Sequence, residues 1–384
     1  MLNLLLGLAY SFVVPFLSMF GTREVGMSEL EFGLFMVATA LSAIVFGTVL
    51  AHFSDTRYTR RSVLLLGSAA GALGYAAYAV LREVWALTLA GMLLLGIASI
   101  TFSQVFALAR ETINRVPGAA AHGAFYINGC RMFFALAWTV GPALASWVMV
   151  GFSYKGLFLC AAGTFAAFFA VVWRFVPVGV PVVAAGKPAA SPLREVLGQG
   201  DALAHFIGFV LLFASGTIGM MNLPLLTLEN LGGTEKNVGI IYSVAPVFEL
   251  PFMFYFGVLA SRRDPARIIQ LGALLAVIYY GLLTQVRLPW HVYPLQVISA
   301  AVVAVTSGVA ITYFQKYLPG HPGTATNLYA NASKIGSTVG YMLFGTLAWR
   351  LGHRAVFGCC TGFSLVALGL LMVKGRRATK EAQA

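Results

Sequence analysis

The chain has 384 residues, of which 59% are hydrophobic and only 10% are charged, and its mean hydropathy is +0.84. Soluble globular proteins carry about 25% charged residues, so this composition excludes a soluble domain. The formal net charge of +12 does not indicate nucleic-acid binding. The basic residues are scattered among short connections instead of forming a stripe interleaved with aromatic residues. The composition is that of a polytopic membrane protein.

Long uncharged runs predict the membrane-spanning helices. Residues 62–81, 84–109, 202–228, 268–286 and 288–315 contain no Asp, Glu, Lys or Arg. Apolar runs of roughly 18 residues or more span membranes as helices, because hydrocarbon forces backbone groups to bond internally. The segmentation predicts an all-α protein with twelve helices, at 2–20, 29–52, 62–81, 85–109, 123–150, 156–176, 202–226, 237–260, 267–286, 292–314, 323–349 and 355–373.

The connections between these helices predict topology and domains. One side of the membrane holds 16 of the 25 Lys and Arg residues and the other holds 7, so the positive-inside rule places both termini in the cytoplasm. The proline-containing connection 177–201 is the longest. We therefore expect a six-helix bundle at 1–176, a cytoplasmic linker at 177–201, a second bundle at 202–373 and a cytoplasmic tail at 374–384. The first span carries no basic leader or cleavage site and is not a signal peptide. It begins abruptly, which leaves a start further upstream open.

Two cytoplasmic turns carry a weak internal repeat. "AHFSDTRYTRR" follows the second predicted helix and "GVLASRRDPAR" follows the eighth. Charged side chains in such turns can join two helices through charge-assisted hydrogen bonds that break when the bundles rock. Basic residues are also common in any cytoplasmic turn, so the ordinary topological explanation stays open. The gate predicted from these turns consists of Asp55, Arg57, Arg61, Arg262 and Arg267.

The first of these turns, "AHFSDTRYTRR", resembles the loop signature of the major facilitator superfamily. "WTVGPALAS", with Gly141 and Pro142, is similar to a fragment of a motif in its exporters. "QVFALARE" (104–111), "CRMFFALAWTVGP" (130–142), "FELP" (248–251) and "YFQKYLPG" (313–320) resemble the bacterial sugar efflux transporters of that superfamily. The resemblance implies two six-helix bundles related by a pseudo-two-fold axis, a central cavity, alternating access, and efflux driven by a proton gradient.

The chain departs from the family pattern at four positions. Ala51 replaces the leading glycine of the turn and Thr59 stands where glycine is frequent. Asn222 occupies a place where related sugar exporters are expected to have an acid, and Lys334 is unexpected at its position. The last two departures alter the charge of the cavity, so the substrate and the coupling stay open.

Three ionisable residues lie well inside predicted helices: Arg131, Glu249 and Lys334. A charge at the bilayer centre costs about 2.5–3.5 kcal/mol on insertion scales, so we expect these side chains to face the interior. Burial raises the pKa of a carboxylate and a nearby cation lowers it, so a glutamate whose cation neighbour moves can exchange a proton. Glu249 is the predicted coupling acid, with Arg131 and Lys334 as partners or substrate ligands. Two structural explanations remain open: a permanent Glu249–Lys334 pair, and an Arg131 that snorkels to the headgroups.

Neutral polar residues in the spans predict the substrate cavity. Amides and hydroxyls suit polyhydroxylated ligands, although the same groups also join helices to one another. The predicted cavity residues are Gln104, Asn128, Asn222, Gln315, Asn327, Tyr329 and Asn331. Asn327, Asn331 and Lys334 are spaced by four and three residues, so they share one helix face.

Other site chemistry is not predicted. The chain has no Walker loop, no H-E-x-x-H and no G-x-S-x-G motif, and its four cysteines have no metal-ligand spacing. We expect no metal, no cofactor, no nucleic-acid partner and no enzymatic activity. The partners expected are a small-molecule substrate, protons and the lipid bilayer, with the protein acting as a monomer.

The function predicted is proton-coupled efflux of sugars or sugar-like molecules across the bacterial inner membrane. An exporter of drugs, siderophores or other metabolites remains an alternative, because the Gly141–Pro142 fragment also occurs in drug exporters. An uncoupled facilitator and an integral membrane enzyme acting on lipid-linked substrates are further alternatives. The 13 acidic residues are thinly spread, which is atypical of such an enzyme. Physical chemistry does not distinguish import from export, since alternating access runs in either direction.

Overall fold

The computed structural model describes residues 1–56, 58–116, 123–178, 200–317 and 322–373, and these are almost entirely helical. The chain forms two compact units. The first comprises residues 1–187 together with 234–246, and the second comprises residues 188–233 and 247–384. The all-α fold predicted from the uncharged runs is therefore confirmed for the described residues.

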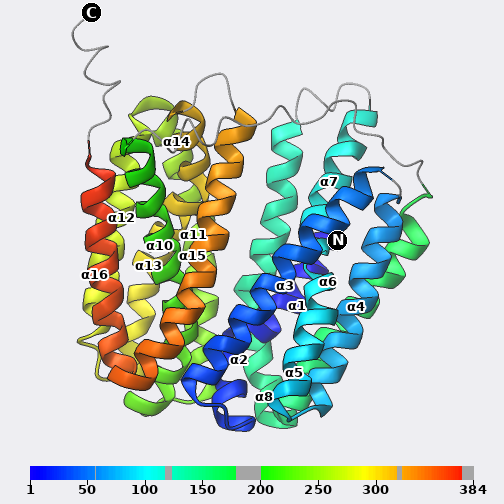
Figure 1. The fold of residues 1–384 in the computed structure, drawn as a ribbon, viewed down its shortest axis with the longest axis horizontal. Helices are drawn as coiled ribbons and strands as arrows, with labels where there is room; N and C mark the ends of the chain where they lie inside the picture. Colours follow the sequence, from blue (N-terminus) through cyan, green and yellow to red (C-terminus); the bar gives the residue numbers. More distant parts are fainter. Residues whose placement is uncertain (57, 117–122, 179–199, 318–321, 374–384) are drawn as a thin grey trace, which may run out of the picture. The chain divides into compact units, whose positions relative to one another are not determined.

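The first unit contains the helices coloured from blue to green-cyan in Figure 1. In chain order they are α1 (Leu2–Val13), η1 (Val14–Phe16), α2 (Leu17–Met19), η2 (Phe20–Glu24), α3 (Glu29–Thr56), α4 (Arg60–Val80), α5 (Val84–Ala90), η3 (Gly91–Leu95), α6 (Gly96–Ala98), α7 (Ile100–Arg115) and α8 (Gly123–Phe175). The start of α11 (Glu235–Arg262) also belongs to this unit.

The second unit contains the remainder of α11 and the other helices of the chain. These are α10 (Gly200–Leu225), η5 (Leu226–Asn230), α12 (Pro265–Leu283), η6 (Pro289–His291), α13 (Val292–Ala304), η7 (Val305–Val309), α14 (Ala310–Tyr317), α15 (Pro322–Leu351) and α16 (His353–Leu371). Short elements such as α5, η3, α6 and α7 continue one another, so several labels make up one long helix.

Ten helices among the described residues are long and apolar enough to cross a membrane. One of them covers 47 residues, Gly129–Phe175, which is enough for two crossings. It bends at Ser153, whose φ of 52° interrupts helical geometry. The predicted connection 151–155 is therefore wrong in extent, because the chain turns there at a single residue. The polar helix α15 is not among the ten, and it supplies the remaining predicted span.

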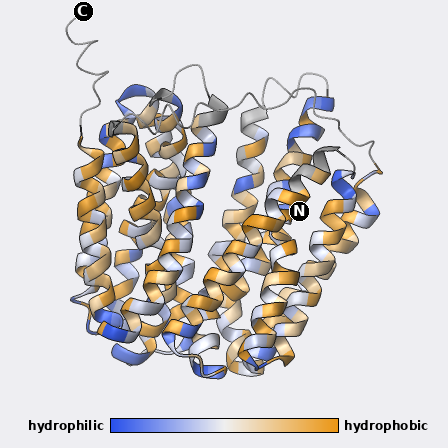
Figure 2. Cartoon of the chain, in the orientation of Figure 1, coloured by the Kyte–Doolittle hydropathy of each residue, from blue (hydrophilic) through white to orange (hydrophobic). Residues whose placement is uncertain are grey.

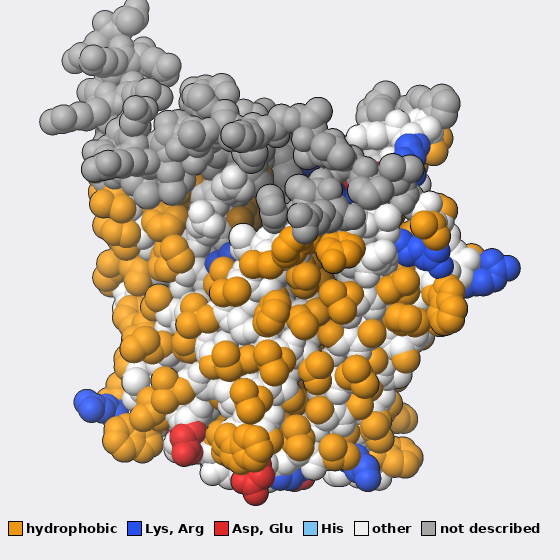
Figure 3. Space-filling view, turned by 45° about the vertical axis from the view of Figure 1, so that its right-hand side comes forward, with side chains coloured by type: hydrophobic (Ala, Val, Ile, Leu, Met, Phe, Trp, Pro, Cys, Tyr) orange, Lys and Arg blue, Asp and Glu red, His pale blue; other side chains and the backbone are white. Residues whose placement is uncertain are grey.

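The outside of the helices is hydrophobic over its middle part. Large apolar side chains are exposed along several helices, for example Leu41, Val45, Leu73, Trp147 and Phe254. Hydrophilic residues gather toward the helix ends (Figure 2), and on the face drawn in Figure 3 the charged side chains also lie mostly toward the ends. Exposed apolar surface of this extent is unfavourable in water and is matched by lipid tails. The protein is therefore a multi-pass membrane protein.

The first helix of each half ends in the same local structure. The π-helical turns η2 (Phe20–Glu24) and η5 (Leu226–Asn230) each lead to a glycine with positive φ, Gly26 at 80° and Gly232 at 65°. Positive φ is the conformation that glycine adopts without steric cost. Two residues further on, a hydroxyl residue caps the next helix. The Glu31 carboxylate accepts from the Ser28 amide at 2.8 Å, and the Asn237 side chain accepts from the Thr234 amide at 2.8 Å.

Sequence spacing shows that these paired features form an internal repeat. The two π-helical turns, the two glycines and the two caps are each separated by the same number of residues along the chain. That number also separates Asp55 from Ser261 in the predicted turn repeat. The π-helical end, the positive-φ glycine and the cap are therefore repeated together with the turn, which extends the repeat beyond the two loops recognised in the sequence.

Helix pairs within each unit approach closely at glycines. In the first unit, a Cβ on Gly7 of α1 would lie 2.9 Å from the backbone oxygen of Phe134 in α8. In the second unit, a Cβ on Gly336 of α15 would lie 2.7 Å from the backbone oxygen of Val210 in α10. Small residues at helix interfaces let backbones pack by van der Waals contact, which drives association inside lipid.

Candidate functional site

A charged cluster joins α4 to α7 in the first unit. Arg60 opens α4, and its Nε donates to Glu111 Oε1 at 2.8 Å. Its Nη1 also donates to Gln104 Oε1 at 3.0 Å. Gln104 and Glu111 lie two turns apart on α7, so both face the same guanidinium. The Arg60 and Glu111 side chains are only 17% and 22% exposed, so this pair is shielded from solvent more than a surface ion pair.

This cluster involves one residue predicted for the cavity and two residues that the sequence analysis did not select. Gln104 is 3% exposed, and its side chain is engaged by Arg60. The turn repeat indicated Arg57 and Arg61, and it did not indicate Arg60 or Glu111. Arg60 binds both ends of the stretch "QVFALARE". The seven-residue spacing of Gln104 and Glu111 places them on one helix face, and this spacing could have indicated a shared partner.

The Arg60–Glu111 pair yields a first prediction. Replacing Glu111 with Gln removes the carboxylate from this ion pair, and loss of a buried hydrogen-bond partner typically costs about 1–3 kcal/mol. If the protein transports a substrate, as the family resemblance predicts, we expect both R60Q and E111Q to lower the initial rate in proteoliposomes, and the exchanged pair R60E/E111R to recover part of it. Arg262 is exposed on α11 and serves as the control: R262Q is expected to leave the rate unchanged. Equal losses in all three single variants would contradict a specific role for the pair.

The predicted gate residues are divided between the two units, with Arg61 in the first and Arg262 and Arg267 in the second. Arg61 Nη2 donates to the carbonyl of Trp173 at 2.7 Å, and Arg262 and Arg267 are exposed. Arg57 and the side chain of Asp55 lie outside the described residues. A gate built from these five residues therefore stays a prediction.

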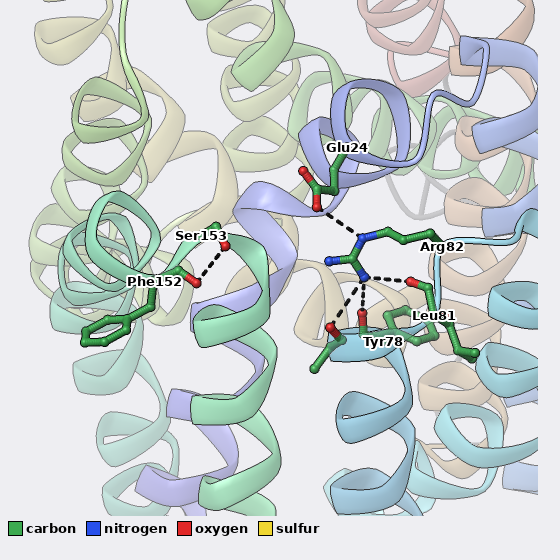
Figure 4. Close-up of polar contacts among 7 residues, drawn as sticks. Glu24, Tyr78, Leu81, Arg82, Phe152 and Ser153 are labelled. Carbon is green, nitrogen blue, oxygen red and sulfur yellow. Dashed lines mark hydrogen bonds and ion pairs between the residues drawn. The ribbon is translucent and has the colours of Figure 1, made fainter.

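Opposite ends of α4 are each held by an arginine. At the Val80 end, Arg82 donates to the carbonyls of Tyr78 and Leu81 at 3.2 and 2.7 Å and to Glu24 Oε1 at 3.1 Å (Figure 4). Its guanidinium also lies 5.3 Å from the centre of the Phe20 ring. The last carbonyls of a helix have no partner within it, so Arg82 satisfies them and joins α4 to η2.

The three predicted membrane charges lie on three different helices. Arg131 is exposed on α8 in the first unit, Glu249 is half-buried on α11 in the second, and Lys334 is exposed on α15. Among the described residues, no carboxylate lies within ion-pair distance of Lys334. A permanent Glu249–Lys334 ion pair, one of the alternatives left open by the sequence, is thus not formed in this structure.

One face of α15 carries the polar residues predicted for the cavity. Asn327, Asn331 and Lys334 are all exposed. The opposite face carries Gly336 and Gly340, which pack on α10. The predicted shared face is therefore formed, and packing within the second unit leaves it uncovered. Gln315 and Tyr329 lie near the same end: Gln315 Nε2 donates to Thr326 Oγ1 at 3.4 Å, and Tyr329 contacts the Phe213 ring edge-on.

Asn222 has a different environment from the one expected for a cavity residue. It is fully buried, its Nδ2 donates to the carbonyl of His353 at 2.7 Å, and its Oδ1 lies 2.8 Å from His353 Nδ1. Both ends of the amide are therefore engaged by one residue of α16. The side chain of Asn128, also predicted for the cavity, lies outside the described residues.

Comparison with known protein families shows which family the chain belongs to. The model of the Major Facilitator Superfamily matches residues 1–341. The chain belongs to the Major Facilitator Superfamily. It is a transporter and not an enzyme, as the sequence predicted. The all-helical architecture and the family resemblance inferred from the quoted motifs are thereby confirmed.

Several curated relatives of this transporter are named as sugar exporters. A protein of Deinococcus radiodurans named "Putative sugar efflux transporter" is 36% identical over 379 residues, covering 97% of this chain and 96% of the relative. "Sugar efflux transporter A" of Dickeya chrysanthemi is 30% identical over 353 residues, covering 92% and 88%. The similarity extends over both halves of the chain, so it is not confined to one motif.

A solved structure has the same fold as this chain. The nucleoside transporter NupG superimposes with a TM-score of 0.80 at 13% identity, covering 97% of this chain and 96% of that one. At this identity the likeness shows the fold alone.

Proposed function

We propose that this transporter exports sugars or sugar-like small molecules in exchange for protons. The observation that supports the proposal most strongly is the 36% identity to a protein named as a putative sugar efflux transporter over 97% of this chain. Alternating access of two bundles supplies the mechanism, because a transporter of this superfamily exposes one substrate site to each side in turn. The proposed location is the bacterial inner membrane, with both termini cytoplasmic and the protein acting as a monomer.

The exposed face of α15 supplies candidate ligands for a sugar. The amides of Asn327 and Asn331 each offer donors and an acceptor, which suit hydroxyl groups. The ammonium of Lys334 adds three donors on the same face. Packing on α10 occupies the opposite face of the helix, so these side chains are available to a substrate.

Helix α11 supplies the proposed coupling acid. Glu249 lies between Pro246 and Pro251, and α11 continues through both prolines. Proline has no backbone N–H, so neither proline donates a hydrogen bond within the helix. A half-buried carboxylate in a span flanked by two prolines is suited to binding a proton or a substrate hydroxyl.

A flux assay tests the substrate and the coupling together. Purified protein in proteoliposomes with an imposed pH gradient is offered a panel of radiolabelled monosaccharides, disaccharides and common drugs. We expect gradient-dependent flux of at least one sugar and abolition of that flux by a protonophore. Flux of drugs without flux of any sugar would contradict sugar export and favour drug export. Sugar flux that does not depend on the pH gradient would contradict proton antiport and favour facilitated diffusion.

A further inference from the structure

The second unit contains a buried polar cluster that the proposed transport mechanism does not use. It consists of Asn222 in α10, Glu229 in η5 and His353 at the start of α16. Asn222 is fully buried and His353 is 6% exposed, whereas the Glu229 side chain is 39% exposed. The cluster therefore has a buried side and an edge that reaches the surface.

Hydrogen-bond directions determine the protonation of the His353 ring. A carbonyl only accepts, so the Asn222 atom that lies 2.7 Å from the His353 carbonyl is the donating Nδ2. The other end of the amide, Oδ1, accepts, and it lies 2.8 Å from His353 Nδ1. The Nδ1 atom must therefore carry a proton.

The second ring nitrogen faces an acceptor as well. His353 Nε2 lies 3.1 Å from Glu229 Oε2, and an ionised carboxylate only accepts. A ring with a proton on Nδ1 alone would present a lone pair to that oxygen. Both contacts are satisfied when the ring carries two protons and pairs with the carboxylate as a charge-assisted hydrogen bond.

We propose that Asn222, Glu229 and His353 form a proton-binding site that holds the start of α16 against the end of the first helix of the second unit. Asn222 positions the ring, Glu229 stabilises its second proton, and the half-exposed carboxylate lets that proton exchange with the medium. When the ring loses the proton, its pairing with Glu229 is lost and this end of the unit loosens. The predicted topology places the site on the side opposite the termini. The proposal does not depend on the identity of the transported substrate.

Several charged and aromatic groups near the site, within the part of the chain that the structure describes, have contacts of their own. Arg354, the next residue in α16, donates to the carbonyls of Thr284 and Val286 after α12. Arg350 at the end of α15 lies 5.8 Å from the centre of the Trp349 ring. From α12, Tyr280 stacks on Phe357 one turn further along α16. From α10, His205 bonds to Val373 and Tyr313 at the opposite end of the helix.

Nitrogen NMR measures the proton directly. The full chain, labelled with ¹⁵N-histidine and purified in detergent, is examined at neutral pH, with H353Q assigning the signals. We expect both ring nitrogens of His353 to be protonated in the wild type, and only Nδ1 to be protonated in E229Q. A neutral His353 ring in the wild type would overturn the proposal. That result does not depend on E229Q, so it holds even if E229Q does not fold.

Thermal unfolding measures what the proton does. Wild-type protein is expected to lose about 2–4 °C in Tm between pH 6 and pH 9 relative to H353Q, because the pairing exists only at the lower pH. His291 lies at the α12–α13 connection, and its Nδ1 accepts from the backbone of Arg287, so H291Q is the matched control. We expect H291Q to follow the wild type. An identical pH dependence in H353Q and the wild type would show that the cluster does not respond to protons.

Discussion

Replacing Glu249 with Gln is expected to abolish gradient-driven efflux, with a loss of more than tenfold, while exchange of labelled for unlabelled substrate persists. Exchange requires only that the substrate site alternate, whereas accumulation against a gradient requires a proton to be bound on one side and released on the other. Glutamine keeps the size of the side chain but removes its negative charge and its ability to take up a proton. The two assays, in the same proteoliposomes, therefore separate coupling from substrate binding.

Glu235 is the matched control for this substitution. It lies at the start of the same helix, α11, and is also half-buried. We expect E235Q to keep gradient-driven efflux within about twofold of the wild type, because a carboxylate in the first turn contributes only a modest interaction with the helix dipole. Normal gradient-driven transport by E249Q would remove Glu249 from the coupling mechanism and leave the carboxylates at helix ends as candidates.

The helices were predictable because lipid imposes a simple requirement on sequence. A stretch that crosses hydrocarbon must be long, apolar and internally hydrogen-bonded, and all three properties follow from composition along the chain. Even α15 was predicted, although Asn327, Asn331 and Lys334 reduce its hydropathy. Helix ends were less predictable, because the π-helical turns η2 and η5 extend the first helix of each half beyond the apolar run.

Partners of polar side chains were much less predictable than the helices. Asn222 reads as a cavity residue in the sequence, but its partner His353 follows 131 residues later. Arg60 likewise bonds to Glu111, 51 residues away. A helical pattern states which face a side chain occupies, and it does not state which distant helix covers that face. Sequence reasoning could therefore select polar residues within helices, but it could not separate those that join helices from those left available.

Replacing Gly336 or Gly340 with Leu is expected to prevent stable folding of the second unit. A single Cβ on Gly336 would lie 2.6 Å from Phe213 Cβ and 2.7 Å from the Val210 backbone oxygen. On Gly340 it would lie 2.8 Å from the Ala214 backbone oxygen and 2.8 Å from Thr217 Cβ. Backbone atoms of a packed helix cannot move aside as a flexible side chain can, so α15 would have to separate from α10. Overpacking by a few methylenes typically costs about 1–3 kcal/mol, and leucine adds four carbons at each position.

Gly358 provides a control in the same unit, since a Cβ there meets nothing within 4 Å. We expect G358L to give monodisperse protein with a Tm within about 2 °C of the wild type, because surface substitutions usually change stability by less than 0.5 kcal/mol. G336L and G340L are expected to give aggregated or low-yield protein, and G336A and G340A to fold with a lower Tm. This graded order follows from the distance between the two backbones: each added carbon must displace α15 further from α10. A fully stable G336L would mean that the two helices do not pack through their glycines, and the exposed polar face of α15 would then have no fixed orientation.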